Sequence, residues 1–106
     1  MLSFFKKLFG AEPNQTDFSQ LVKEGAIIVD VRTKSEYDRG HINGSINISV
    51  DKLPNNLHLL NNKDKPIITC CASGNRSTSA LNFLKTKGYS KLYNGGGWQS
   101  LSKKIM

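Results

Sequence analysis

The two cysteines of this chain are adjacent residues, Cys70 and Cys71. A disulfide between neighbours closes almost no loop and strains the backbone, so the pair is not a structural crosslink. His41 and His58 lie far from both thiols in sequence and match no zinc-site spacing, so we expect no bound metal and no other cofactor. The alternatives that remain are a buried structural thiol and a reactive thiol.

The residues after Cys71 favour a reactive thiol, because they form a short loop between an apolar run and a helical pattern. Such a loop at the carboxyl end of a parallel strand points backbone N–H groups and the positive end of the helix dipole inward, which suits an anion. Gly74 lets the loop curl tightly, and Arg76 adds a planar set of N–H donors. The residues expected to line this anion site are Ala72, Ser73, Gly74, Asn75, Arg76 and Ser77, with Thr78 close by.

The same groups stabilise a thiolate relative to a thiol. Cysteines at helix N-termini beside cations ionise more readily than free cysteine does. We therefore expect Cys71 to be a nucleophilic thiolate at neutral pH, with no histidine acting as its base. Cys71 is the predicted catalytic residue.

Alternating strand and helix patterns predict the elements that hold this loop. Runs of β-branched and other apolar residues indicate strands at 26–31, 44–49, 66–70 and 91–94. Helices are expected at 17–23 with Thr16 as the cap, at 51–60, at 76–87 and from about Trp98. A capping box at Thr33-Lys-Ser-Glu36 starts a further short helix, which ends at Gly40. The glycines at 95–97 are expected to turn into the last helix. This order predicts a three-layer α/β fold, with a central, mostly parallel sheet and helices on both faces.

Length and composition indicate one ordinary globular domain. The 106 residues divide into an N-terminal amphipathic segment with its linker at 1–15 and a folded unit at 16–106. No apolar run approaches the roughly 20 residues that a membrane-spanning helix needs. Lys6 and Lys7 interrupt the apolar residues between Phe4 and Phe9, whereas a secretory signal keeps them continuous. We expect a cytoplasmic protein whose first segment docks on the domain; contact with a membrane surface and an atypical export signal are the alternatives.

The formal net charge of +7 raises the local concentration of anions around the protein. The basic residues are scattered, and no zinc-finger spacing or aromatic RNA-binding strand lies among them. We therefore expect a small anion as the partner and no specific nucleic acid.

The segment Cys71-Ala-Ser-Gly-Asn-Arg76-Ser77 resembles the Cys-x-x-Gly-x-Arg-Ser active-site loop of the rhodanese family of sulfurtransferases. Val29-Asp-Val-Arg32, followed by Glu36 and by Gly40-His-Ile-Asn-Gly44-Ser-Ile-Asn-Ile48, is similar to two further segments of that family. Asn94-Gly-Gly-Gly97 resembles its C-terminal glycine turn, so the similarity runs from about residue 16 to 102.

The resemblance implies a single-domain rhodanese that acts as a thiosulfate sulfurtransferase. The Cys71 thiolate would attack the outer sulfur of an anionic donor such as thiosulfate and become a persulfide. Cyanide or a thiol, such as one on a sulfur-relay protein, would then accept the sulfur. The loop N–H groups and Arg76 would hold the donor and stabilise the persulfide charge.

The adjacent cysteines leave a second chemistry open. Arg76 lies six positions after Cys70, which is the Cys-x5-Arg spacing of tyrosine phosphatases, and five positions after Cys71, which matches the smaller sulfurtransferase loop. Gly74 stands three residues after Cys71, and no aspartate in the loop offers the general acid that a phosphatase needs. We therefore expect sulfur transfer on Cys71, with Cys70 in the core; a Cys70-based phosphatase and a Cys70 that resolves the persulfide are the less favoured alternatives.

Charged residues elsewhere have structural explanations. Asp30, Arg32 and Glu36 are expected to form an ion-pair and capping set that supports the active-site loop, and His41 to make a structural hydrogen bond.

A different class of function stays open beside the enzyme. In this alternative the domain is a sulfur carrier or binding module that a partner protein loads, with the apolar residues between Phe4 and Phe9 as a docking surface.

Overall fold

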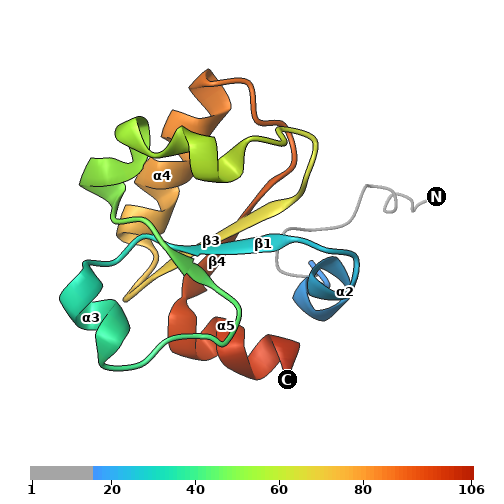
Figure 1. The fold of residues 1–106 in the computed structure, drawn as a ribbon. Coiled ribbons are helices and arrows are strands. Elements are labelled where there is room, and N and C mark those ends of the chain that lie inside the picture. The colour runs from blue at the N-terminus through green and yellow to red at the C-terminus, as the bar shows by residue number, and fades with distance from the viewer. Residues whose placement is uncertain (1–15) are drawn as a thin grey trace.

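The computed structural model describes residues 16–106, and the amphipathic segment predicted before them lies outside the described residues. Four parallel strands form one sheet in the order β2-β1-β3-β4 (Figure 1). They are β1 (Ile27–Asp30), β2 (Ile46–Asn47), β3 (Ile67–Cys71) and β4 (Leu92–Gly97). All five residues of β3 are buried, as the continuous apolar run predicts for a central strand.

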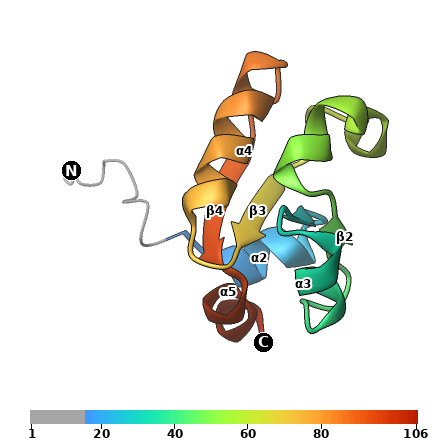
Figure 2. The ribbon, with the colours of Figure 1, turned by 90° about the vertical axis from the view of Figure 1, so that its left-hand side faces the viewer.

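Helices cover both faces of the sheet, so the predicted three-layer α/β fold is confirmed (Figures 1 and 2). α2 (Phe18–Lys23) and α5 (Trp98–Ile105) pack together on one face. α4 (Asn75–Thr86) lies on the other, beside two 3-10 helices, η2 (Val50–Asn55) and η3 (Leu57–Leu60). The short α3 (Lys34–Asp38) follows β1.

The side chains of β3 divide between two apolar clusters, one on each face. Ile67 and Cys71 pack with Ala80 and Leu84 of α4. On the other face, Ile68 and Cys70 pack with Phe18, Ile28, Ile42 and Leu101. The alternation follows from strand geometry, in which successive side chains point to opposite faces.

Two helical predictions need correction. Asp17, rather than Thr16, caps α2, because its carboxylate accepts the N–H of Gln20 three residues on at 3.0 Å. The continuous helix expected at 51–60 is instead η2 and η3, separated by Asn56, whose φ of −128° is not helical. Pro54 inside η2 has no N–H to donate, which favours short 3-10 pieces over a continuous α-helix.

The glycines at 95–97 were expected to form a turn. They are instead the last three residues of strand β4, and α5 begins directly after them. Thr69 faces Asn94 and Cys71 faces Gly97, so two steps along β3 match three along β4, and the extra residue is a β-bulge. A methyl group on Gly95 would lie 2.8 Å from the Thr69 carbonyl oxygen, and one on Gly97 would lie 3.0 Å from that of Ala72. Gly95 and Gly97 are therefore required because the backbone of β3 and the following loop passes close to them.

No helix within residues 16–106 is both long enough and apolar enough to span a bilayer.

Candidate active site

Cys71 is the last residue of β3 and is 1% exposed. Its Sγ atom accepts two backbone N–H groups, from Gly74 at 2.9 Å and from Ser77 at 3.3 Å. Gly74 has φ of +104°, the left-handed conformation that a glycine adopts without strain, as the expected tight curl requires. The loop therefore folds back over the sulfur that precedes it.

The sulfur takes the place of a helix cap. Gly74 is the N-cap of α4 and offers no side chain to the N–H groups of the first turn. Serine, threonine or aspartate oxygens usually accept those N–H groups. Here Cys71 Sγ accepts the N–H of the cap residue and that of the third helical residue, Ser77. A negative charge on this sulfur lies at the positive end of a twelve-residue helix dipole.

Arg76 is held by a carboxylate from across the site. Its guanidinium donates to Glu36 Oε1 at 2.7 Å and to Oε2 at 3.0 Å, a two-bond ion pair between α4 and α3. The Arg76 hydrogen bonds, together with the Thr33 backbone N–H, lower the pKa of Glu36 from 4.5 to about 2. The pair uses two of the five N–H groups of the guanidinium, so part of its donor capacity is not committed to Glu36.

Asp30, the last residue of β1, and Arg32 form a buried ion pair. Arg32 Nη2 donates to Asp30 Oδ2 at 2.7 Å and to the Gly40 carbonyl at 2.7 Å, and the guanidinium lies 4.7 Å from the centre of the Trp98 ring. The hydrogen bonds to Asp30 raise the pKa of Arg32. The pair links the end of β1 to the Gly40 carbonyl that follows α3; its support of the active-site loop stays a prediction.

Cys70 faces the opposite side of the sheet from Cys71. It is fully buried in the cluster with Ile28, Ile68 and Leu101. Burial and the nearby Asp30 carboxylate raise the pKa of Cys70 to about 12. Cys70 is thus packed in the core on the face away from the loop, which favours Cys71 as the thiol of the site.

The exposed part of the loop carries the remaining predicted binding residues. Ala72, Ser73 and Asn75 are exposed, whereas Ser77 is fully buried. Ser73 and Asn75 line a cavity of about 560 Å³ that also contacts Phe18 of α2 and Lys104 of α5. The structure therefore brings every predicted loop residue to one end of β3, while Arg76 is turned toward α3.

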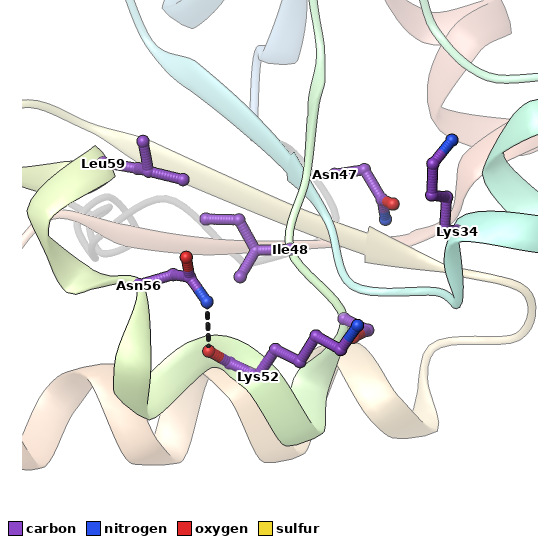
Figure 3. A pocket seen from close by; sticks show the side chains of 7 residues that line it. Lys34, Asn47, Ile48, Lys52, Asn56 and Leu59 are labelled. Carbon is purple, nitrogen blue, oxygen red and sulfur yellow. Dashed lines mark hydrogen bonds between the residues drawn. The ribbon is translucent and has the colours of Figure 1, made fainter.

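A second cavity of about 200 Å³ lies between α3 and η2 (Figure 3). Lys34, Lys52 and Asn47 line it, and the Asn56 amide is directed at the Lys52 carbonyl at 2.8 Å. None of its lining residues belongs to the loop after Cys71, so it is separate from the predicted site.

The sequence predictions missed two features of the site. Glu36 was expected in an ion-pair and capping set with Asp30 and Arg32, and nothing in its spacing identifies Arg76 as its partner 40 positions away. Asn94 was assigned to the end of a strand and to the glycine turn, yet its side chain contacts the first turn of α4. An asparagine directly before a glycine run is the one signal that could have marked it. The expected structural hydrogen bond of His41 is present, since Nδ1 lies 2.8 Å from the Tyr37 carbonyl oxygen.

One family of known proteins matches most of the chain. The family model described as "Rhodanese-like domain" matches residues 14–104. The chain belongs to this family. A thiosulfate sulfurtransferase GlpE from Stutzerimonas stutzeri is 33% identical over 93 residues, which cover 79% of this chain and 84% of the relative. A rhodanese-related protein from Thermoplasma volcanium has a solved structure with a TM-score of 0.69 at 32% identity, covering 84% of this chain and 90% of that one.

One relative places the same domain in a larger protein. A tRNA uridine(34) hydroxylase from the Onion yellows phytoplasma is 37% identical over 92 residues. The match covers 79% of this rhodanese-like chain but only 29% of the hydroxylase. The family thus occurs both as a small enzyme and as one part of a longer chain.

Proposed function

We propose that this protein is a sulfurtransferase that carries sulfane sulfur as a persulfide on Cys71. The observation that supports it most is the pair of N–H groups, from Gly74 and Ser77, on Cys71 Sγ. Hydrogen bonds to an ionised acceptor are about twice as strong as those to a neutral one. The pair thus favours a sulfur atom that bears negative charge.

The proposed reaction has two displacements on sulfur. The Cys71 thiolate attacks the outer sulfur of thiosulfate, a Cys–S–S⁻ persulfide forms, and the sulfur–sulfur bond of the donor breaks with release of sulfite. The acceptor then attacks the outer sulfur, and the Cys71 thiolate leaves. Cyanide becomes thiocyanate and a thiolate becomes a persulfide, so each step balances without an added oxidant or reductant.

The loop residues divide the remaining work in this proposal. The exposed Ala72, Ser73 and Asn75 would contact the donor at the mouth of the loop. Arg76 would bind the donor anion through the N–H groups that Glu36 does not use. Because Cys71 is only 1% exposed, a small donor fits better than a bulky one.

Intact-mass measurement tests the proposal. After incubation with thiosulfate, the protein should gain the mass of one sulfur atom and lose it on addition of cyanide. Cys71→Ser should abolish the gain, and Cys70→Ser, the matched control one residue away, should keep it. Sulfur gain that depends on Cys70 would overturn the assignment, and turnover of a phosphate ester without sulfur loading would replace the proposed chemistry.

A partner-loaded module is the second candidate, because a match covering 29% of the tRNA uridine(34) hydroxylase shows this family within a larger protein. In that case thiosulfate would leave the mass unchanged, and sulfur would appear on Cys71 only from a persulfidated protein donor. The cytoplasmic setting expected from the sequence fits either candidate and stays a prediction.

A further inference from the structure

Asn94 of β4 joins the glycine bulge to the first turn of α4 through its side chain. Its Oδ1 accepts the Ser77 hydroxyl at 2.6 Å and the Gly96 N–H at 2.9 Å. Its Nδ2 donates to Thr78 Oγ1 at 2.9 Å. Ser77 is also one of the two residues whose N–H reaches Cys71 Sγ.

The direction of each hydrogen bond in this network follows from the groups involved. A backbone N–H can only donate, so the Asn94 atom beside Gly96 N must be the oxygen. The amide nitrogen then donates to Thr78, whose single proton goes to the Gly74 carbonyl at 2.9 Å. Ser77 gives its proton to Asn94, and Thr69 Oγ1, 2.6 Å away, donates to the Ser77 hydroxyl. Both acceptor positions of the Asn94 oxygen and one of its two N–H donors are therefore assigned.

The two arms of Asn94 end on the residues that bind the sulfur. One arm reaches Ser77 directly, and the other reaches Gly74 through Thr78. Gly74 and Ser77 supply both N–H groups on Cys71 Sγ. Only a side chain with an acceptor and a donor in one plane can serve both arms, which an amide does and a carboxylate does not.

We propose that Asn94 is a positioning residue for sulfur transfer, one that sets the Gly74 and Ser77 N–H groups at hydrogen-bond distance from Cys71 Sγ. The inference rests on the proposed function, since it assigns Asn94 to the persulfide-forming step. The hydrogen bonds of the Asn94 side chain go to Ser77, Thr78 and Gly96 and not to Cys71 Sγ, so Asn94 acts on the sulfur through Ser77 and Thr78. Its position on the bulge connects the end of β4 to the geometry at the sulfur.

The test uses Asn94→Ala, Thr78→Val and the double variant, with Ser79→Ala as the matched control. Ser79 makes the same kind of bond as Thr78, from its hydroxyl to the Asn75 carbonyl at 3.4 Å, but has no link to Asn94. Intact mass follows the rate of sulfur loading over a range of thiosulfate concentrations. Urea unfolding at the same temperature gives the folded fraction, and rates are taken per folded molecule.

Asn94→Ala should lower the maximal loading rate about tenfold, the effect of about 1.4 kcal/mol on a barrier. The thiosulfate concentration at half-maximal rate should stay within about twofold, because the N–H groups contact Sγ rather than donor. Thr78→Val should lower the rate by a smaller factor, and the double variant should lose less than the product of both, since the arms form one network. Ser79→Ala should load at the wild-type rate.

The inference would be overturned if folded Asn94→Ala protein loads sulfur at the wild-type maximal rate. It would also be overturned if the fold-loss in the double variant equals the product of the two single losses, and Asn94 would then be a purely structural residue. If the wild-type protein takes no sulfur from thiosulfate, the proposed donor chemistry fails instead. Alkylation of Cys71 by iodoacetamide then decides the inference, because that rate depends on the same N–H groups without any sulfur donor. An unchanged alkylation rate in Asn94→Ala would refute it.

Discussion

Replacing Glu36 with glutamine tests how much the Glu36–Arg76 ion pair stabilises the fold. Glu36 binds Arg76 through both carboxylate oxygens, at 2.7 and 3.0 Å, and its Oε1 also accepts the Thr33 N–H at 2.9 Å. Glutamine keeps one carbonyl oxygen for these donors but loses the charge and the second acceptor. The substitution therefore removes the ionic part of the pair and preserves its shape.

The expected cost at neutral pH is modest. The two side chains are 31% and 35% exposed, so water screens the pair, and two-bond geometry places it at the upper end of the range for exposed ion pairs, about 1 kcal/mol. For a domain of this size, such a loss lowers Tm by about 4–8 °C. The matched control is Asp38→Asn, because the Lys34–Asp38 pair is more exposed, at 79% and 57%. Its effect should stay below about 0.5 kcal/mol.

The pH dependence gives the stronger test. Folding lowers the pKa of Glu36 from 4.5 to about 2, so below pH 4.5 the unfolded chain binds a proton that the folded chain does not yet bind. The stabilisation is complete above about pH 4.5 and is lost as the pH falls through 2. Glutamine does not titrate, so the Tm difference between wild type and Glu36→Gln should close over that window. A difference that is the same at pH 3 and pH 7, or absent at pH 7, would refute the reasoning.

Three further predictions concern the buried parts of the fold. Gly95→Ala should lower the free energy of unfolding in urea by about 2–4 kcal/mol, because its methyl group would lie 2.8 Å from a backbone carbonyl oxygen. Gly44→Ala is the control: the added methyl group meets open space, and only the φ of +87° is unfavourable, so the loss should be about 1 kcal/mol. Folding raises the pKa of Cys70 to about 12, so stability should fall as the pH rises above 9, and Cys70→Ala should flatten that decline in alkaline thermal unfolding. Asp30→Asn leaves Arg32, only 4% exposed, without its carboxylate, and should lower the free energy of unfolding by about 3–5 kcal/mol; a loss below about 1 kcal/mol would show that the pair is dispensable.

Local patterns predicted most of the fold. The apolar run before Cys71 predicts a central strand, and the helix of twelve residues that follows lies within one residue of its expected bounds. The capping box between Thr33 and Glu36 is present with both of its hydrogen bonds. These features depend on residues within a few positions of one another, which a single sequence displays directly.

Contacts between residues far apart in the sequence could not be predicted from local patterns. The Glu36–Arg76 pair joins residues 40 positions apart, and the bulge in β4 depends on how closely the Thr69 and Ala72 backbone approaches. A run of glycines reads as a turn when only its own flexibility is considered. The separation of Cys70 from Cys71 was predicted from loop spacing, but its physical basis is the alternation of side chains along β3.

Thr69 affects which alignment strand β3 adopts in the sheet when the chain folds. Because every residue of β3 is buried, apolar character alone does not distinguish the native alignment of this strand from one shifted by a single residue. A shift would exchange the two thiols, placing Cys70 under the loop, and would carry the Thr69 hydroxyl away from Ser77 into the apolar cluster of the other face. An unpaired buried hydroxyl costs about 1–3 kcal/mol, which is enough to reject the misaligned strand. One threonine thus decides which of two identical neighbouring side chains is presented for chemistry.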